Sequence, residues 1–344
     1  MKLSLIYLTA RKSDGPMYGR PDTHLLLPTL ESLERQSFKD FELILVDTLW
    51  ESRNLLAEAH ALGKWSFPIK ITHPTPWWGS GNGWSKQSSA NNGIRMSSGE
   101  WVLQLDDCCE IPDGMLQKAM DQTHRGSPHL LCCYKIGGFL TAQNPAQPML
   151  GQPNMPMLPK TEYQTVEEAQ KAGVWGDDKF VRDSRWKQAE AHGGFAYLSW
   201  ASGYAYGFFR RSSLYTVNGY DERFDGSKPL GDVEIGSRLE MIGLWDAFVD
   251  TSLFIYENQH CSCESVKGEG PTSEWSNYDL LYWMRINRVW KANSSIIPAA
   301  DMQRICNCDI TGVDKPDKRY TFTDGDPAWP KQRMWIQRQK VNPL

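Results

Sequence analysis

The chain has 344 residues, of which 40% are hydrophobic and 23% charged, so it can bury a sizeable core and is not wholly disordered. Its 41 acidic and 37 basic residues give a formal charge of −4, which excludes a broad cationic surface for nucleic acid. The first apolar run, Leu3 to Leu8, is too short to cross a membrane and lacks the pattern of a signal peptide. The composition therefore predicts a soluble, cytoplasmic protein with one large domain or two.

The eight cysteines occur in close pairs, which is not the pattern of a small domain stapled by disulfides. They are therefore expected to be mostly reduced thiols. The alternative is a zinc site made by Cys261, Cys263, Cys306 and Cys308. The spacing within these pairs is shorter than in the usual zinc knuckle, and the sequence leaves this alternative open.

The first part of the sequence alternates apolar runs with segments of helical periodicity. It predicts strands at residues 3–8, 41–46, 69–72 and 101–105, and helices at 26–33, 52–62 and 88–96. This alternation favours an α/β fold with a mainly parallel central sheet flanked by helices. Ligands of such sheets bind beyond the carboxyl ends of the strands, where Asp47, Asp106 and Asp107 are expected.

The alternating pattern breaks at about residues 135–196, a polar stretch punctuated by prolines, with one short helical piece at 166–171. Such a long irregular segment is typical of a lid or a binding loop. Order resumes at 197–210, followed by a helix at 231–243, a strand at 245–256 and a helix at 276–291. We expect a main domain over residues 1–265 that contains this insertion, and a helical or irregular C-terminal extension over 266–344.

Two consecutive carboxylates follow the predicted strand at 101–105. At the end of a buried strand, Asp106 and Asp107 must be hydrated, hydrogen-bonded or bound to a cation, because their repulsion otherwise raises a pKa. A hard divalent ion that also bridges a diphosphate meets this need. The alternative is a capped turn before Ile111, and the two acids alone do not decide between these interpretations.

Four motifs follow one another along the chain, at residues 32–47, 89–107, 202–224 and 231–239. They resemble those of family-2 glycosyltransferases of the GT-A fold. The family patterns are, in order, SLxxQ before a strand ending in acids, ARNxGI with GEYxxxLDDD, FRR with GGFDExF, and EDxDLxxRL. Each motif is common alone, whereas all four in order are specific. The resemblance implies a nucleotide-binding α/β domain that transfers a sugar from a nucleotide donor, usually with inversion.

The resemblance also implies which residues bind the donor, expected to be a UDP-sugar. Thr9 and Arg11 match positions that contact the nucleotide, and Asp47 matches the acid that pairs with the base edge, commonly uracil. Asn91, in the second motif, and Lys86, just before it, complete the predicted donor-binding set. Because Ala90 replaces the usual arginine beside Asn91, the diphosphate charge is left to Lys86, Arg11 or Arg95.

The same resemblance implies a metal site and a general base. Asp106 and Asp107 match the DxD-like region, where Mn²⁺ or Mg²⁺ binds the donor diphosphate, and His260 lies where some relatives place a further ligand. Asp232 matches the carboxylate that takes the proton of the acceptor hydroxyl, a step worth about 10²–10⁴-fold in rate. The alternative for Asp232 is a structural acid at a helix start.

Four positions depart from the family patterns: Thr48 replaces a second acid, Ala90 an arginine, Cys108 a third aspartate and Gly231 an acid. These departures support one alternative, a non-catalytic nucleotide- or glycan-binding protein. A second alternative, a nucleotidyltransferase, shares the fold class. The acceptor is open among a glycan, a lipid-linked glycan, a protein and a modified nucleic-acid base.

Overall fold

The computed structural model describes residues 1–13, 23–74, 86–107, 109–123, 129–136, 181–182, 193, 195–198, 206–225, 231–242, 247–257, 281, 284–286, 288 and 290–292. The strands in these segments are β1 (Leu3–Thr9), β2 (Phe41–Asp47), β3 (Ile69–Thr72), β4 (Trp101–Asp106), β5 (Cys109–Glu110), β6 (His129–Ile136), β7 (Val181–Arg182), β8 (Phe195–Leu198), β9 (Gly207–Arg210) and β10 (Ala247–Glu257). The helices are α1 (Leu27–Glu34), α2 (Leu55–Leu62), α3 (Lys86–Met96), α4 (Met115–Gln122), α7 (Arg211–Thr216) and α8 (Gly231–Met241), with a 3-10 turn, η3 (Glu222–Phe224).

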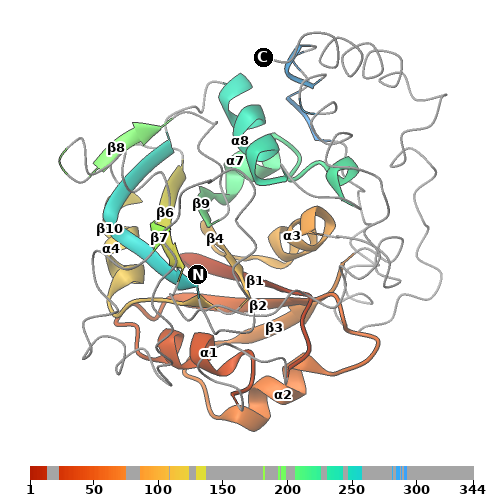
Figure 1. The fold of residues 1–344 in the computed structure, drawn as a ribbon, viewed down its shortest axis with the longest axis vertical. Coiled ribbons are helices and arrows are strands. Elements are labelled where there is room, and N and C mark those ends of the chain that lie inside the picture. The colour runs from red at the N-terminus through yellow and green to blue at the C-terminus, as the bar shows by residue number, and fades with distance from the viewer. Residues whose placement is uncertain are drawn as a thin grey trace.

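All described strands join one sheet with the order β3-β2-β1-β4-β9-β6-β10-β5, and β7 and β8 pair with β6 and β10 (Figure 1). The half formed by β3, β2, β1 and β4 is parallel throughout, and β6 and β10 are also parallel to each other. β9 runs antiparallel between β4 and β6, and the short strands β5, β7 and β8 are antiparallel to their neighbours. The predicted α/β fold with its mainly parallel central sheet is confirmed.

The two faces of the parallel half are covered by different helices, as the alternation of buried side chains requires. Leu3, Leu5 and Tyr7 of β1 pack in one core cluster with residues of α1, α2 and α4. Ile6 and Leu8 face the opposite side and pack with α3, α7 and α8. Within the described segments, no helix combines the length and apolar character that a membrane crossing needs.

Several elements differ from those predicted. α2 begins at Leu55 rather than Ser52, because the side chain of Asn54 accepts a hydrogen bond from Ala57 N and caps the helix. Neither β6 nor α4 was predicted, and β6 ends within the region expected to be irregular. Of the helix expected at 276–291, residues 281 and 284–286 are helical, whereas the described residues 288, 290 and 291 are not. The helical piece expected at 166–171 lies outside the described residues.

The turn before β4 lies directly against the start of β1. Gly99 N donates to Ser4 Oγ over 2.8 Å, and Ser4 Oγ donates to the buried carboxylate of Glu42 over 2.7 Å. A Cβ on Gly99 would lie 2.6 Å from the backbone nitrogen of Ser4. Backbone cannot move aside as a side chain can, so this position requires glycine.

We therefore expect Gly99→Ala to lower the free energy of unfolding by about 1–3 kcal/mol, the usual range for overpacking a buried site. Urea denaturation followed by circular dichroism measures the change. Lys118→Ala, on the exposed side of α4, is the control and is expected to stay within about 0.5 kcal/mol of wild type. Equal unfolding midpoints for Gly99→Ala and wild type would contradict the close approach to β1.

Candidate active site

The carboxyl ends of β1, β2 and β4 bring the predicted donor-binding residues to one edge of the sheet. The parallel register places Thr9 opposite Asp47 and Leu8 opposite Asp106. Asp107 follows directly after β4. The prediction that the three acids gather at this edge is confirmed.

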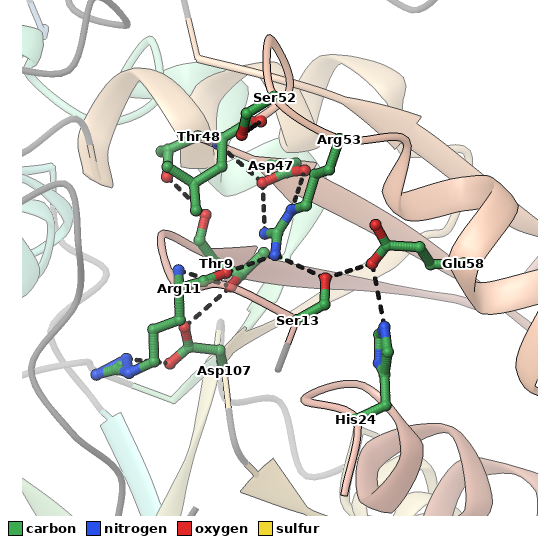
Figure 2. Close-up of polar contacts among 11 residues, drawn as sticks. Thr9, Arg11, Ser13, His24, Asp47, Thr48, Ser52, Arg53, Glu58 and Asp107 are labelled. Atoms are coloured by element: carbon green, nitrogen blue, oxygen red, sulfur yellow. Dashed lines mark hydrogen bonds and ion pairs between the residues drawn. The ribbon is translucent and has the colours of Figure 1, made fainter. Parts of the chain in front are cut away.

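Asp107 is held by two residues from the end of β1 and the loop beyond it (Figure 2). Thr9 Oγ1 donates to Asp107 Oδ2 over 3.0 Å, and Arg11 Nη1 donates to Asp107 Oδ1 over 2.9 Å. The side chains of Arg11 and Asp107 are only 12% and 8% exposed, so water weakens this ion pair less than a surface pair. The structure thus joins three of the predicted site residues in one contact.

Asp106 has a different cationic partner. Lys86, the first residue of α3, lies with its Nζ 3.1 Å from the Asp106 carboxylate. Their side chains are 18% and 31% exposed, so this pair is more open to solvent than the Arg11–Asp107 pair. Each of the two neighbouring acids is thus balanced by one cation from another segment.

The oxygen donors at this edge suit a hard divalent cation. Among the described residues, no group of three or more histidines, cysteines and acids is placed to hold a metal ion. Mg²⁺ commonly takes one or two carboxylates and fills its remaining positions with substrate phosphates and water. Asp106 and Asp107 therefore fit a cation that is held jointly with a diphosphate.

The other predicted metal ligands fall outside the described residues. They are His260 and the four cysteines of the alternative zinc site, Cys261, Cys263, Cys306 and Cys308. Their roles stay predictions. Cys109, which is described, is buried and is not part of a disulfide.

Asp47, predicted to meet the base edge, is fully buried and paired with Arg53. Arg53 Nε and Nη2 donate to its two oxygens over 2.7 and 2.6 Å, and Leu49 N donates to Oδ1 over 2.9 Å. A carboxylate has about four acceptor sites, so these contacts leave little capacity for a ligand. The contact between Asp47 and a base stays a prediction. The sequence analysis missed Arg53, and its only signal was a cation six residues after a buried acid.

Asn91, also predicted to bind the donor, is buried and joins α3 to the segment before η3. Its Nδ2 donates to Tyr220 O and Glu222 Oε1 over 2.9 and 2.8 Å, and its Oδ1 accepts from Tyr220 N over 2.7 Å. Gly219, at φ +71°, leaves the room that this contact needs, because a Cβ there would lie 2.3 Å from Asn91 Oδ1. These contacts give Asn91 a structural role, and a donor contact stays a prediction.

The start of α3, which carries Lys86, is fixed by an acid far along the chain. Both oxygens of Asp225 accept backbone hydrogen bonds, from Gln87 N and Ser88 N, over 2.8 Å each. Burial raises the pKa of Asp225 well above its usual value, although the backbone donors favour its charged form. Asp225 therefore caps α3, a contact that the sequence analysis did not predict.

Asp232, the predicted general base, is the second residue of α8 and is half-buried. The helix is anchored by the fully buried Arg238, which donates to Glu234 over 2.7 Å and to the carbonyls of Val217 and Gly219 over 2.8 and 2.7 Å. Burial raises the pKa of Glu234 to about 7 against the opposing effect of Arg238. These contacts hold the first turn of α8, and with it Asp232, on rigid structure.

The segment that carries Tyr220 lies between the carboxyl end of β4 and the first turn of α8. The buried phenol of Tyr220 donates to Gln104 Oε1 on β4 over 2.6 Å. Burial raises its pKa well above the usual value, and the negative charges of Glu234, Asp232 and Asp106 raise it further. The next residue, Asp221, donates from its backbone N to Glu234 Oε1 over 3.0 Å, so residues 220–221 contact both β4 and the first turn of α8.

Comparisons with known proteins agree with this architecture. The pattern of Glycosyl transferase family 2 matches residues 16–184. A comparison with curated protein sequences finds no match.

Two similar solved structures are those of S. aureus TarS 1-349 in complex with UDP-GlcNAc and of S. aureus TarS 1-349. The first has a TM-score of 0.54 at 14% identity, covering 99% of this chain and 82% of the TarS chain. The second has a TM-score of 0.52 at 14% identity, covering 98% of this chain and 78% of the TarS chain. At these identities the likeness establishes the fold. The matched pattern over residues 16–184 supports a family-2-like glycosyltransferase, and the solved structures show its GT-A fold.

Proposed function

We propose that the chain transfers a sugar from a UDP-sugar to an acceptor hydroxyl, with inversion and with the help of Mn²⁺ or Mg²⁺. The observation that carries this proposal is the pairing of Asp106 with Lys86 and of Asp107 with Arg11 at one sheet edge. The fold shared with the UDP-GlcNAc complex of TarS supports a UDP-sugar as donor.

The paired charges at the edge can change partners when a donor binds. Asp107 and Asp106 would hold the divalent cation, which neutralises the charge that builds on the departing diphosphate. Arg11 and Lys86, relieved of their carboxylate partners, can then donate to phosphate oxygens. Charge stays balanced because the divalent cation replaces Arg11 and Lys86 beside the two carboxylates, while these side chains pair with the phosphate oxygens. Thr9 Oγ1, which donates to Asp107 over 3.0 Å, helps to keep that carboxylate in place.

Asp232 supplies the proton acceptor on the other side of the reacting carbon. The acceptor oxygen forms a bond to the anomeric carbon as the bond from that carbon to the diphosphate oxygen breaks. The hydroxyl proton passes to the Asp232 carboxylate, and the nucleoside diphosphate leaves with the electron pair. A single displacement of this kind inverts the anomeric configuration, and it needs the base to be held rigidly.

The proposal also includes the division of the chain into two parts that was predicted from the sequence. Residues 1–265 form the transferase domain, and residues 266–344 form an extension. From this extension, Ala292 N donates to Val217 O over 2.8 Å, and its carbonyl accepts from Asn218 Nδ2 over 3.0 Å. The proposed location is the cytoplasm, and the acceptor is a glycan, a lipid-linked glycan, a protein or a modified nucleic-acid base.

Asp232→Asn tests the general base. The amide cannot accept the proton, so transfer from UDP-GlcNAc, measured as UDP release, is expected to fall by about 10²–10⁴-fold while UDP binding is kept. Glu240→Gln, an equivalent exchange near the end of the same helix, is the control and should keep full activity. Turnover by Asp232→Asn within a few-fold of wild type would reject Asp232 as the base.

The same assays separate the proposed function from its alternatives. UDP binding without UDP release, across a panel of UDP-sugars and acceptors, would favour a non-catalytic binding protein. Release of pyrophosphate from a nucleoside triphosphate and a sugar phosphate would favour a nucleotidyltransferase.

Chelation tests the divalent cation. EDTA is expected to abolish transfer and to weaken UDP binding measured by calorimetry, and excess Mn²⁺ should restore both. Asp107→Asn is expected to reproduce the effect of EDTA, with little rescue by added Mn²⁺. As a control, Asp113→Asn alters only an exposed surface pair. Full activity in EDTA would contradict the proposed dependence on metal.

A further inference from the structure

The guanidinium of Arg53 lies between the ends of β1 and β2 at the edge of the site (Figure 2). Arg53 belongs to the turn after β2, immediately before the Asn54 cap of α2, and its side chain is only 8% exposed. We propose that Arg53 is a positioning residue that fixes the segment carrying Arg11, and through it the Arg11–Asp107 pair that meets the donor diphosphate. This inference rests on the proposed function.

The contact with Asp47 fixes the plane of the guanidinium. Two nitrogens of Arg53 donate to the two oxygens of Asp47 over 2.6 and 2.7 Å, in the bidentate geometry that matches a fork to a carboxylate. Asp47 is fully buried, and removing the partner of a buried charge is strongly destabilising. Asp47 thus needs Arg53, and in return it sets the direction of the remaining guanidinium nitrogen.

That remaining nitrogen reaches the segment after β1. Arg53 Nη1 donates to the carbonyl oxygen of Arg11 over 2.5 Å and to Ser13 Oγ over 3.0 Å. Ser13 Oγ also hydrogen-bonds to Glu58 on α2, and Glu58 pairs with His24 Nε2 over 3.0 Å. The backbone from which the Arg11 side chain extends is therefore held from the β2–α2 side of the site.

From this fixed backbone the Arg11 side chain extends to Asp107, where the donor diphosphate is proposed to bind. Its Nη1 lies 2.9 Å from Asp107 Oδ1, and its backbone N donates to Thr9 Oγ1 over 3.4 Å. Thr48 adds a second tie between the two strands, because its backbone N and Oγ1 both donate to Thr9 O, over 3.0 and 2.8 Å. Arg53 thus joins Asp47, at the predicted base end, to Arg11 and Asp107, without itself needing to touch the donor.

Arg53→Lys tests this role in the full chain. Lysine keeps the charge that Asp47 needs, but its single ammonium cannot form the fork and also reach the carbonyl of Arg11. We expect the dissociation constant of UDP with Mn²⁺, measured by calorimetry, to rise about tenfold, as for other residues that orient binding groups. Arg35→Lys, which alters an exposed pair with Asp113, is the matched control and should bind UDP as wild type does.

A double-mutant cycle shows whether Arg53 acts through Arg11. If it does, adding Arg53→Lys to Arg11→Met should weaken UDP binding by less than about threefold further, because the group being positioned is already absent. The inference would be overturned if the loss of UDP affinity in the double variant equalled the product of the losses in the two single variants. Unchanged UDP binding by Arg53→Lys alone would overturn it as well.

A second variant keeps the test decisive should Arg53→Lys fail to fold. Ser13→Ala removes one of the acceptors of Arg53 and leaves the Asp47 pair intact, and we expect it to weaken UDP binding about threefold with no further loss in the Arg11→Met background. Wild-type affinity in Ser13→Ala would then refute the positioning role. Failure of the wild-type chain itself to bind UDP would instead refute the proposed function, and the inference with it.

Discussion

Two adjacent carboxylates at the end of a buried strand repel each other, and the active edge of this sheet is organised around that repulsion. Asp106 is balanced by Lys86 from α3, and Asp107 by Arg11 from the segment after β1. Because both cations come from other segments, the balance holds only while α3 and the end of β1 keep their places beside β4. The accuracy of the site therefore depends on contacts that fix these segments rather than on the acids alone.

Those supporting contacts share one physical form, in which a buried polar side chain satisfies backbone groups of a distant segment. Asp225 caps the start of α3, and Arg53 binds the carbonyl of Arg11. Arg238 of α8 donates to two carbonyls at and just after the end of α7. Removing such a side chain leaves backbone donors or acceptors unsatisfied, which costs more than the contact itself is worth. These contacts from distant residues therefore stabilise the three segments of the site more than the hydrogen bonds within short helices could.

Sequence reasoning succeeded where the signal is local. Parallel strands covered on both faces appear as continuous apolar runs, so β1, β2 and β4 and the acids that follow them were predictable. The sequence analysis missed α4, an eight-residue helix, although its buried residues Met115, Leu116 and Ala119 have helical spacing. β6 was not predicted either, and its end lies in the stretch expected to be irregular.

The partners of the site residues could not be predicted in the same way. Asp225 lies 138 residues from the backbone nitrogen that it caps, and Glu222 lies 131 residues from Asn91. Such pairs exist only once the sheet has brought its segments together, and no spacing along the chain encodes them. The motif containing Asn91 located the right helix, whereas the contacts of this residue with Tyr220 and Glu222 became visible only in three dimensions.

The departures from the family patterns bear on whether the site has decayed into a binding module, and the structure describes three of the four. Thr48 uses both its backbone and its hydroxyl to tie β2 to Thr9, so it has a defined contact in place of an acid. Ala90 is buried in the core between α3 and the sheet, where an arginine would need a partner for its charge.

Gly231 lies at the start of α8, beside Gln87 of α3. A Cβ there would lie 1.4 Å from Gln87 Nε2, the far end of a flexible side chain, so a larger residue at this position needs Gln87 to move. A decaying site would show exchanges that leave gaps or unpaired charges, whereas Thr48 has defined hydrogen bonds and Ala90 packs in the core. These two departures are therefore compatible with the catalytic roles proposed for Asp106, Asp107 and Asp232.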